Sequence, residues 1–268
     1  MAIITISRGS YSNGKAVAEE VARRLGYRCI SREVLIEASE HFNIREIKLV
    51  RALHDAPSIL DRFTYGKERY LAYFAAAFLG EVQEDNVVYH GLAGHFFVRG
   101  VSHVIKVRII TDLEARVRLE MEREGISADE ARRVLKKDDQ ERRRWSRYLF
   151  GVDTWDAALY DLVVHVHKLS VDDAVDLICR TAGLTQFQIT PQSRQTLNDL
   201  LLAARVKARL VEVKPQVAVS ARGGQVLIHS ETPENLEPEV VRELERVATA
   251  VSGVTQVTVH DTPRSVYG

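Results

Sequence analysis

Short apolar runs alternate with amphipathic stretches along the first two thirds of the chain. A β-branched run at residues 2–7 predicts a strand, and helical periodicity at 16–25 predicts a helix that Gly26 ends. Further strands are predicted at 86–90, 103–110 and 162–167, and further helices at 32–41, 45–78 with breaks near Pro57 and Gly66, 112–124, 128–148 and 170–181. Strands separated by helices are typical of a parallel sheet covered by helices on both faces.

The last third of the chain has a different pattern. A polar stretch at residues 186–193 contains Pro191 and lacks a clear period, so we predict a linker there. Beyond it we predict a helix at 196–213, strands at 216–221 and 225–229 joined by Gly223-Gly224, a helix at 238–252 and a strand at 254–260. The predicted domains are an α/β domain over 1–184, a linker over 185–195 and a small α+β domain over 196–268.

The composition is that of a globular protein with enough apolar side chains for a sizeable core. Hydrophobic residues make up 46% of the 268 residues, charged residues 28%, and the net charge is zero. Zero net charge argues against binding a polyanion over the whole surface, and we expect no DNA partner. Cys29 and Cys179 lack metal-ligand spacing, and the N-terminal residues lack the pattern of a signal peptide. The apolar run at 70–79 is about half the ~20 residues that cross a bilayer, so we expect a buried helix there and a cytoplasmic protein.

A phosphate-binding loop is predicted between the first strand and the first helix. The segment reads Gly9-Ser10-Tyr11-Ser12-Asn13-Gly14-Lys15, which matches the GxxxxGK spacing of a P-loop. The glycines let the backbone N–H groups approach a phosphate chain, and the start of the following helix favours an anion. The predicted fold is therefore the three-layer α/β fold of P-loop NTPases, with Lys15 reaching the terminal phosphates of a nucleotide.

Ala16 follows the loop lysine, at a position where a Ser or Thr hydroxyl normally binds Mg²⁺. Three readings stay open. Water completes the metal shell, or Ser10 or Ser12 supplies an oxygen, or the site binds nucleotide without efficient turnover. The metal ligands are therefore not assigned.

A second charged feature is the segment at residues 132–147, which holds eight basic and three acidic residues. Arginines on a helix that folds over a nucleotide would neutralise the phosphoryl group in transfer, so we interpret this segment as a lid. Arg143 and Arg147 share a helical face, and Asp139 lies four residues before Arg143, where it is expected to hold that side chain. The alternatives are a solvated helix with internal ion pairs and an RNA contact that uses Trp145 and Tyr148.

These residues together resemble the cytidylate kinase-like family of nucleoside monophosphate kinases over residues 1–184. The resemblance rests on Ile4-Thr5-Ile6-Ser7-Arg8 before the loop, Leu25-Gly26-Tyr27 before Ser31-Arg32-Glu33, RVRLEMEREG at 116–125, the series Asp139, Arg142, Arg147 and Tyr148, and Tyr160-Asp161-Leu162. Three positions differ from the family pattern: Ser31 in place of Asp, Ala16 in place of a hydroxyl residue, and Leu92 in place of Arg. These differences leave the acceptor open.

The resemblance implies ATP as donor, with Mg²⁺, and a nucleoside monophosphate as acceptor. It implies that the donor is held by Gly9, Ser10, Ser12, Asn13, Gly14, Lys15, Ala16 and Arg116. Lys15, Arg142 and Arg147 would be catalytic, and Arg32, Asp139 and Arg143 would contact the acceptor or the transferring group. His90 and His95 flank the end of the second predicted strand and receive low weight, because a lone histidine is more often structural.

The C-terminal domain is similar to BON domains, small modules of bacterial envelope proteins suggested to bind membranes or ligands. The similar residues are 217–219, 223–228 and 251–257, and a generic packing or dimerisation domain is the alternative. A binding module fused to a kinase-like domain suggests activity tuned by a ligand or membrane contact, and it leaves room for a homo-oligomer.

Three functions follow from these features. The leading hypothesis is an ATP-dependent phosphotransferase acting on a nucleotide or a similar small acceptor. The rival is a nucleotide-binding sensor with a degenerate P-loop and little turnover. A structural or assembly protein is the third, and it predicts no stabilisation by ATP.

Overall fold

The computed structural model describes residues 2–9, 13–31, 64–91, 94–231 and 236–260. The predicted helices at 32–41 and at 45–63 lie outside these ranges. So do the site residues Ser10, Ser12 and Arg32, and Leu92.

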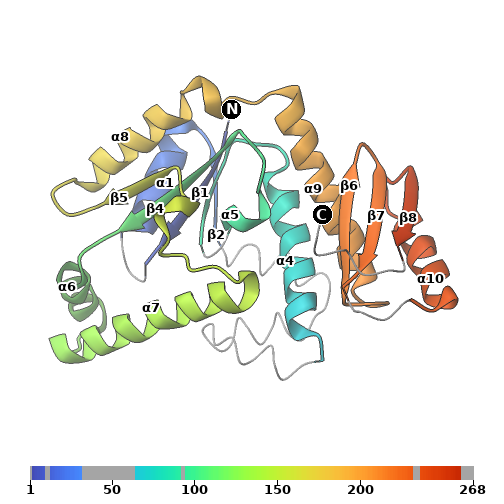
Figure 1. Ribbon diagram of the computed structural model, residues 1–268. Helices are drawn as coiled ribbons and strands as arrows, with labels where there is room; N and C mark the ends of the chain where they lie inside the picture. The colour runs from blue at the N-terminus through green and yellow to red at the C-terminus, as the bar shows by residue number, and fades with distance from the viewer. Residues whose placement is uncertain (1, 10–12, 32–63, 92–93, 232–235, 261–268) are drawn as a thin grey trace.

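A five-stranded parallel sheet forms the first unit of the molecule (Figure 1). Its strands are β1 (Ile3–Arg8), β2 (Arg28–Ser31), β3 (Val87–His90), β4 (Val104–Ile110) and β5 (Leu162–His165), in the spatial order β2-β3-β1-β4-β5. The predicted parallel sheet is confirmed, but β2 was not predicted. Only Ile30 of this strand is buried, and Arg28 and Cys29 are exposed, so the sequence has no apolar run there.

The two faces of the sheet bury different side chains of β1. Ile4 and Ile6 point toward α1 (Gly14–Leu25) and α8 (Val171–Ala182), whereas Ile3 points to the opposite face. That opposite face is covered by α4 (Gly66–Val82), α5 (Gly94–Phe97) and the end of α7 (Ala128–Phe150). The predicted buried helix at 70–79 lies within α4, and the period-two alternation of β1 is what allows helices on both faces.

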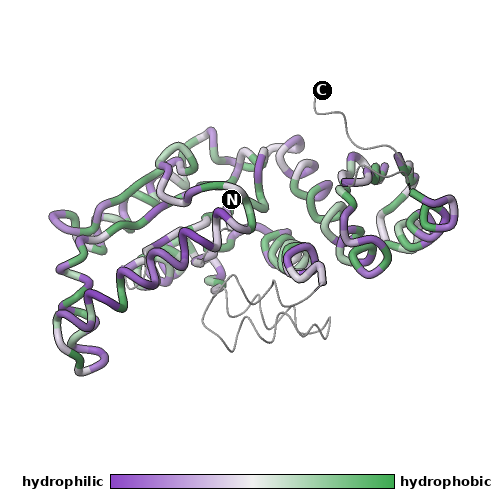
Figure 2. Tube along the Cα trace, turned by 60° about the horizontal axis from the view of Figure 1, so that its bottom comes forward, coloured by the Kyte–Doolittle hydropathy of each residue, from purple (hydrophilic) through white to green (hydrophobic). Residues whose placement is uncertain are grey.

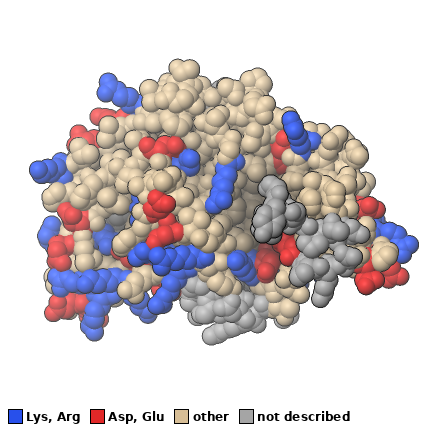
Figure 3. All heavy atoms as spheres, in the orientation of Figure 1, with Lys and Arg blue, Asp and Glu red and all other residues tan. Residues whose placement is uncertain are grey.

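A helical hairpin projects from the end of the sheet at which the strands finish (Figure 1). It consists of α6 (Leu113–Glu124) and α7, and its turn contains Gly125 at φ 67°, as predicted for a helix stop. Ser127 caps α7 by accepting a hydrogen bond from the Glu130 N–H. Figure 2 shows most of α7 as hydrophilic, and in Figure 3 charged side chains gather over this hairpin.

The second unit has the predicted order of one helix, two strands, one helix and one strand. Its elements are α9 (Pro191–Leu210), β6 (Val217–Arg222), β7 (Gln225–Ser230), α10 (Pro238–Thr249) and β8 (Gln256–His260). β7 pairs antiparallel with β6 and parallel with β8. Gly223 and Gly224 both have positive φ, which a two-residue hairpin turn requires. Short 3-10 turns lie at Ala157–Leu159 and Thr185–Phe187.

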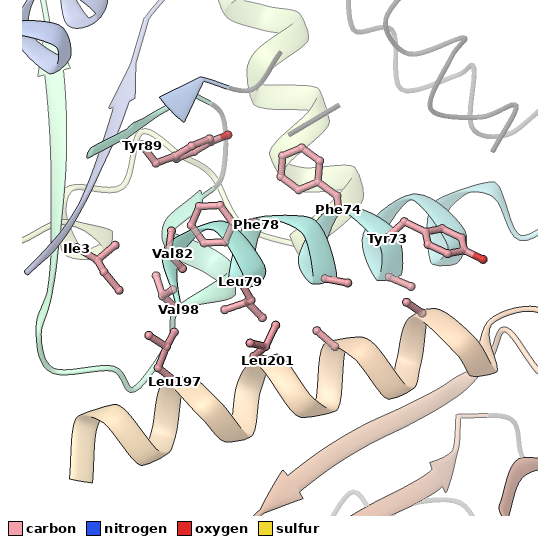
Figure 4. Packing of buried hydrophobic residues seen from close by; sticks show 14 of the residues in the cluster. Ile3, Tyr73, Phe74, Phe78, Leu79, Val82, Tyr89, Val98, Leu197 and Leu201 are labelled. Carbon is pink, nitrogen blue, oxygen red and sulfur yellow. The ribbon is translucent and has the colours of Figure 1, made fainter. Parts of the chain in front are cut away.

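Helix α9 belongs to two hydrophobic cores. Leu197 and Leu201 pack against α4 in the first core (Figure 4). Val206 and Leu210 pack against the small sheet. The helix begins at Pro191, five residues earlier than predicted, because Thr190 and Ser193 form a capping box in front of it. The sequence showed one amphipathic helix, and the structure shows a helix with two buried faces.

Polar contacts fix α9 at both ends. Arg194 forms an ion pair with the buried Asp85, which also contacts Nε2 of His103 at 3.0 Å. At the other end, Glu212 pairs with Arg69 at 2.7 Å and accepts a hydrogen bond from the Tyr73 hydroxyl at 2.8 Å. Both contacts join the second unit to segments of the first. In the part of the chain that the structure describes, no helix is long and apolar enough to cross a membrane.

We predict that Leu197→Ala lowers the free energy of unfolding by about 2–5 kcal/mol, because it leaves a cavity at the contact of α9 with α4. Urea denaturation followed by circular dichroism measures the loss. Leu184→Ala is the control, since this leucine is 42% exposed and its truncation should cost far less. An equal loss in the two variants would contradict the packing of α9 described above.

Candidate functional site

The predicted phosphate loop lies at the carboxyl end of the central strand. β1 ends at Arg8, α1 begins at Gly14, and residues 10–12 are outside the described ranges. A Cβ atom at Gly14 would lie 2.7 Å from the Cβ atom of Arg8, so this position requires glycine. Asn13 makes no side-chain hydrogen bond to the first turn of α1, which leaves N–H groups of that turn for an anion. The described part of the loop thus fits a nucleotide phosphate chain.

Lys15 and Ala16 both lie exposed in the first turn of α1. The Lys15 ammonium group is 3.7 Å from the Glu19 carboxylate, and the two side chains are 65% and 55% exposed. Such a surface pair contributes little free energy, so Lys15 can exchange Glu19 for a phosphate at small cost. Ala16 offers no side-chain oxygen for a metal ion. Within the described ranges no cluster of three or more His, Cys, Asp or Glu side chains could hold one.

An ion pair from the helical hairpin contacts the start of the loop. Arg116 of α6 donates two hydrogen bonds to Asp139 of α7, at 3.1 and 2.7 Å, and the two side chains are only 8% and 16% exposed. A Cβ atom at Gly9 would lie 3.1 Å from Nη1 of Arg116. Three of the predicted site residues, Gly9, Arg116 and Asp139, are therefore brought together.

The partner predicted for Arg143 is wrong. Asp139 is engaged by Arg116, and Arg143 instead pairs with Asp153, with its Nη2 atom 2.5 Å from Oδ2. Arg147 reaches the same carboxylate oxygen at 2.7 Å, so the expectation that Arg143 and Arg147 share one face is confirmed. Arg143 therefore pairs with an aspartate of the loop after α7 and not with the aspartate four residues before it on the same helix.

Asp153 is a strong local anion. Its pKa is held well below its usual range, first by the hydrogen bond from Arg143 and further by the Trp155 backbone N–H and the charge of Arg147. The guanidinium group of Arg143 also lies over the Trp155 ring, 4.3 Å from its centroid. The remaining predicted arginine, Arg142, is half-buried on α7.

A buried network beneath the loop was missed by the sequence analysis. Arg108 of β4, 8% exposed, donates a hydrogen bond to the Thr154 carbonyl oxygen at 2.6 Å. The Tyr160 hydroxyl donates to the same carbonyl at 2.9 Å and lies 3.2 Å from the Ser7 hydroxyl at the end of β1. The available signal was Arg108 itself, a charge in a strand of mostly β-branched residues, which needs a polar partner if it is buried.

A cavity of about 320 Å³ joins these features. It is lined by Gly9, Arg116 and Asp139 on the loop side, and by Arg108, Trp155 and Val163 on the sheet side. Two arginines and an indole ring around one space suit a ligand that carries both phosphate and an aromatic or apolar group.

His95 is a buried histidine that is neutral at neutral pH. It is 4% exposed, and its ring is 4.0 Å from the Phe96 ring and 5.0 Å from the Tyr160 ring, measured between centroids. Burial lowers its pKa to about 3, with a further contribution from the charges of Lys106, Arg99 and Arg108. The low weight given to this histidine as an acid–base group agrees with its neutral, packed state. His90 lies within β3, paired in register with Ile6.

The burial of His95 predicts a pH dependence of stability. The unfolded chain binds a proton with an ordinary pKa near 6.5, whereas the folded chain does so only near pH 3, so stability falls as the pH decreases between these values. At pH 5.5 this residue should cost about 1 kcal/mol relative to pH 8. His95→Gln should therefore lose less stability than the native chain between pH 8 and 5.5, measured by urea denaturation. If His95→Gln keeps the pH dependence of the native chain, the assigned environment is wrong.

The fold and the site together define a class. A parallel sheet in the order β2-β3-β1-β4-β5, with the predicted phosphate loop after β1 and an arginine-bearing hairpin next to Gly9, is a P-loop kinase fold. The chain belongs to the cytidylate kinase-like family, whose model matches residues 3–168. Residues after 168 lie outside that match.

Individual relatives are cytidylate kinases, and their sequence identity to this chain is modest. A cytidylate kinase of Staphylothermus marinus is 28% identical over 188 residues, which is 66% of this chain and 94% of that protein. A cytidylate kinase of Methanopyrus kandleri is 29% identical over 104 residues, so that match spans about half of the relative, 54%, and 36% of this chain. A solved structure of an uncharacterized protein from Eubacterium ventriosum has a TM-score of 0.55 at 22% identity, covering 68% of this chain and 97% of that one. This last similarity concerns the fold alone.

Proposed function

We propose that this protein transfers the γ-phosphoryl group of ATP to a nucleoside monophosphate. The observation that supports the proposal is the proximity of the Arg116–Asp139 pair to Gly9, the first residue of the predicted phosphate loop. Phosphoryl transfer needs positioning and neutralisation of the moving group more than covalent participation by the protein. A loop for the donor and arginines that can approach it from the hairpin are suited to that task.

The proposed roles follow the positions of the residues. The backbone of Gly9 through Gly14, including Ser10, Ser12 and Asn13, and the first turn at Ala16 would hold the donor phosphates, with Arg116 beside them. Lys15 would neutralise the terminal phosphates. Arg142 and Arg147 would stabilise the transferring group, and Arg143 and Asp139 would orient it. Arg32 is proposed to approach the acceptor, and bound Mg²⁺ would screen the charge between the donor phosphates.

The ion pairs of the hairpin make these arginines available without leaving them unpaired in the absence of substrate. Arg147 is 58% exposed, and it shares the Asp153 carboxylate with Arg143, which is 31% exposed. A phosphate oxygen can replace that carboxylate as the acceptor of the same guanidinium hydrogen bonds. Arginine is suited to this exchange because its fork binds carboxylate and phosphate with the same geometry.

Lys15→Ala should abolish ADP formation from ATP in the presence of the nucleoside monophosphate that supports it best, a loss of at least a hundredfold in kcat/KM, or about 3 kcal/mol of transition-state stabilisation. A coupled assay over CMP, UMP, AMP, GMP and dCMP identifies the acceptor and measures the loss. Arg23→Ala is the matched control, because Arg23 is an exposed cation on the same helix whose ion pair, within the described residues, is with Glu20. The absence of acceptor-dependent ADP formation across the whole panel would refute the proposal.

The rival function is a nucleotide sensor whose loop binds ATP without efficient turnover. Ala16 motivates it, since this exposed residue has no hydroxyl to offer Mg²⁺. The variant Ala16→Thr distinguishes the sensor from a working kinase. If water completes the metal shell in a working kinase, we expect kcat at saturating Mg²⁺ to change by less than about tenfold, which corresponds to 1.4 kcal/mol. A larger, Mg²⁺-dependent gain would favour the sensor, with native turnover measured in the same assay as the reference.

We extend the proposal to the C-terminal unit, which we infer is a BON-like module that adjusts the activity of the first unit in the cytoplasm. Its support is the similarity of residues 217–219, 223–228 and 251–257 to such modules, together with the packing of α9 against α4. Helix α4 leads through a short turn into β3, whose end faces the site. A change in the position of α9 would therefore shift α4, and with it the end of β3 that faces the site.

A further inference from the structure

A second cavity, of about 630 Å³, lies between the two units of the molecule. It is formed by Ala76 of α4, by Arg205, Ala208 and Arg209 of α9, and by α10 with the turn that follows it. None of its lining residues belongs to the phosphate loop or to the α6–α7 hairpin. Its size falls within the range of small-molecule sites, and it is separate from the cavity described above.

Two arginines give this groove an uncompensated positive charge. Arg205 and Arg209 are exposed and lie four residues apart, on one face of α9. Like charges at this spacing repel each other, so this pair of arginines lowers the stability of the helix. Neither side chain has a carboxylate partner within the described ranges, whereas Arg194 of the same helix pairs with Asp85, and Arg246 of α10 pairs with Glu243.

The rest of the lining is small and apolar. Ala76 and Ala208 are at most 9% exposed and belong to the core between α4 and α9, and Val247 and Val251 line the groove from α10 and the turn after it. Small side chains at this contact leave room for a ligand, and apolar walls favour a ligand with an apolar or aromatic part. The two guanidinium groups are suited to bind the oxygens of one phosphate or diphosphate.

We propose that the groove between α4, α9 and α10 is a second binding site, for a free phosphorylated small molecule that carries an apolar or aromatic group. The phosphate would bind Arg205 and Arg209, and the apolar part would pack between Ala208 and Val247. Arg205 and Arg209 line the same groove as residues of α4 and α10, and a groove formed by three helices favours a soluble ligand over a flat membrane surface. Because the ligand would contact both units, its binding would bear on how they pack.

The test is a titration of the full chain with inorganic pyrophosphate, followed by NMR of ¹³C-labelled alanine methyl groups. Ala208 and Ala250 report on the groove, and Ala157 reports on the cavity beside the phosphate loop. We expect saturable shifts of the Ala208 and Ala250 signals. The double variant Arg205→Gln, Arg209→Gln should weaken this binding at least tenfold and leave the Ala157 response unchanged.

Arg222→Gln is the matched control, because Arg222 is an exposed arginine of the same unit outside the groove, and it should leave the groove response unchanged. The spectrum of each variant shows directly whether it is folded. The proposal is overturned if the groove methyl signals stay fixed, if they move equally in the double variant, or if sodium chloride of the same ionic strength moves them as far. Arginine-dependent binding to phosphatidylglycerol vesicles without a pyrophosphate response would assign the face to membranes and also overturn it. A shift confined to Ala157 would leave the proposed kinase function intact and refute only the second site.

Discussion

The parallel pairing of β1 on both sides is the constraint on which the rest of the site depends. β1 lies between β3 and β4, with Ile6 opposite His90 on one side and Ser7 opposite Arg108 on the other. Because all the strands run in the same direction, their carboxyl ends meet at one edge of the sheet, where open α/β folds bind ligands. The loop after β1, the helix that follows it and the hairpin after β4 converge there as a consequence. The strand order therefore brings the segments of the site together, and the individual side chains determine what the site can bind.

Paired charges then determine how that edge is used. Arg116 and Asp139 are nearly buried and hold each other against Gly9, while Asp153 holds the two arginines at the end of α7. A carboxylate that binds guanidinium groups stands where a phosphate would make the same hydrogen bonds. Desolvated charges without partners would be costly, so the aspartates keep the arginines in place and the structure stable before a substrate binds. Under the proposed function, substrate binding exchanges one anion for another.

Sequence reasoning recovered the parts that depend on local chemistry. The first strand and the first helix, the stop at Gly125 with its cap at Ser127, and the Gly223-Gly224 hairpin each depend on residues close together in the chain. What it missed depends on contacts between distant segments. β2 has one buried residue and no apolar run, the network of Arg108 with the Thr154 carbonyl joins positions 46 residues apart, and Asp139 took a partner from α6 instead of from its own helix. The two buried faces of α9 could likewise not be predicted from its sequence, because each face is buried by a different unit of the molecule. The substrate roles assigned to individual residues stay predictions.

The central claim is that the phosphoryl group leaves ATP and arrives on a nucleoside monophosphate, and its most direct test follows that group. ATP labelled with ³²P at the γ position is incubated with the full chain, Mg²⁺ and each nucleoside monophosphate, and the labelled products are separated by thin-layer chromatography. Transfer at a site built from the loop, Arg116 and the arginines of α7 predicts label in a nucleoside diphosphate, in proportion to the ADP formed. Label that stays in ATP, or that appears only as inorganic phosphate with every acceptor, would contradict it.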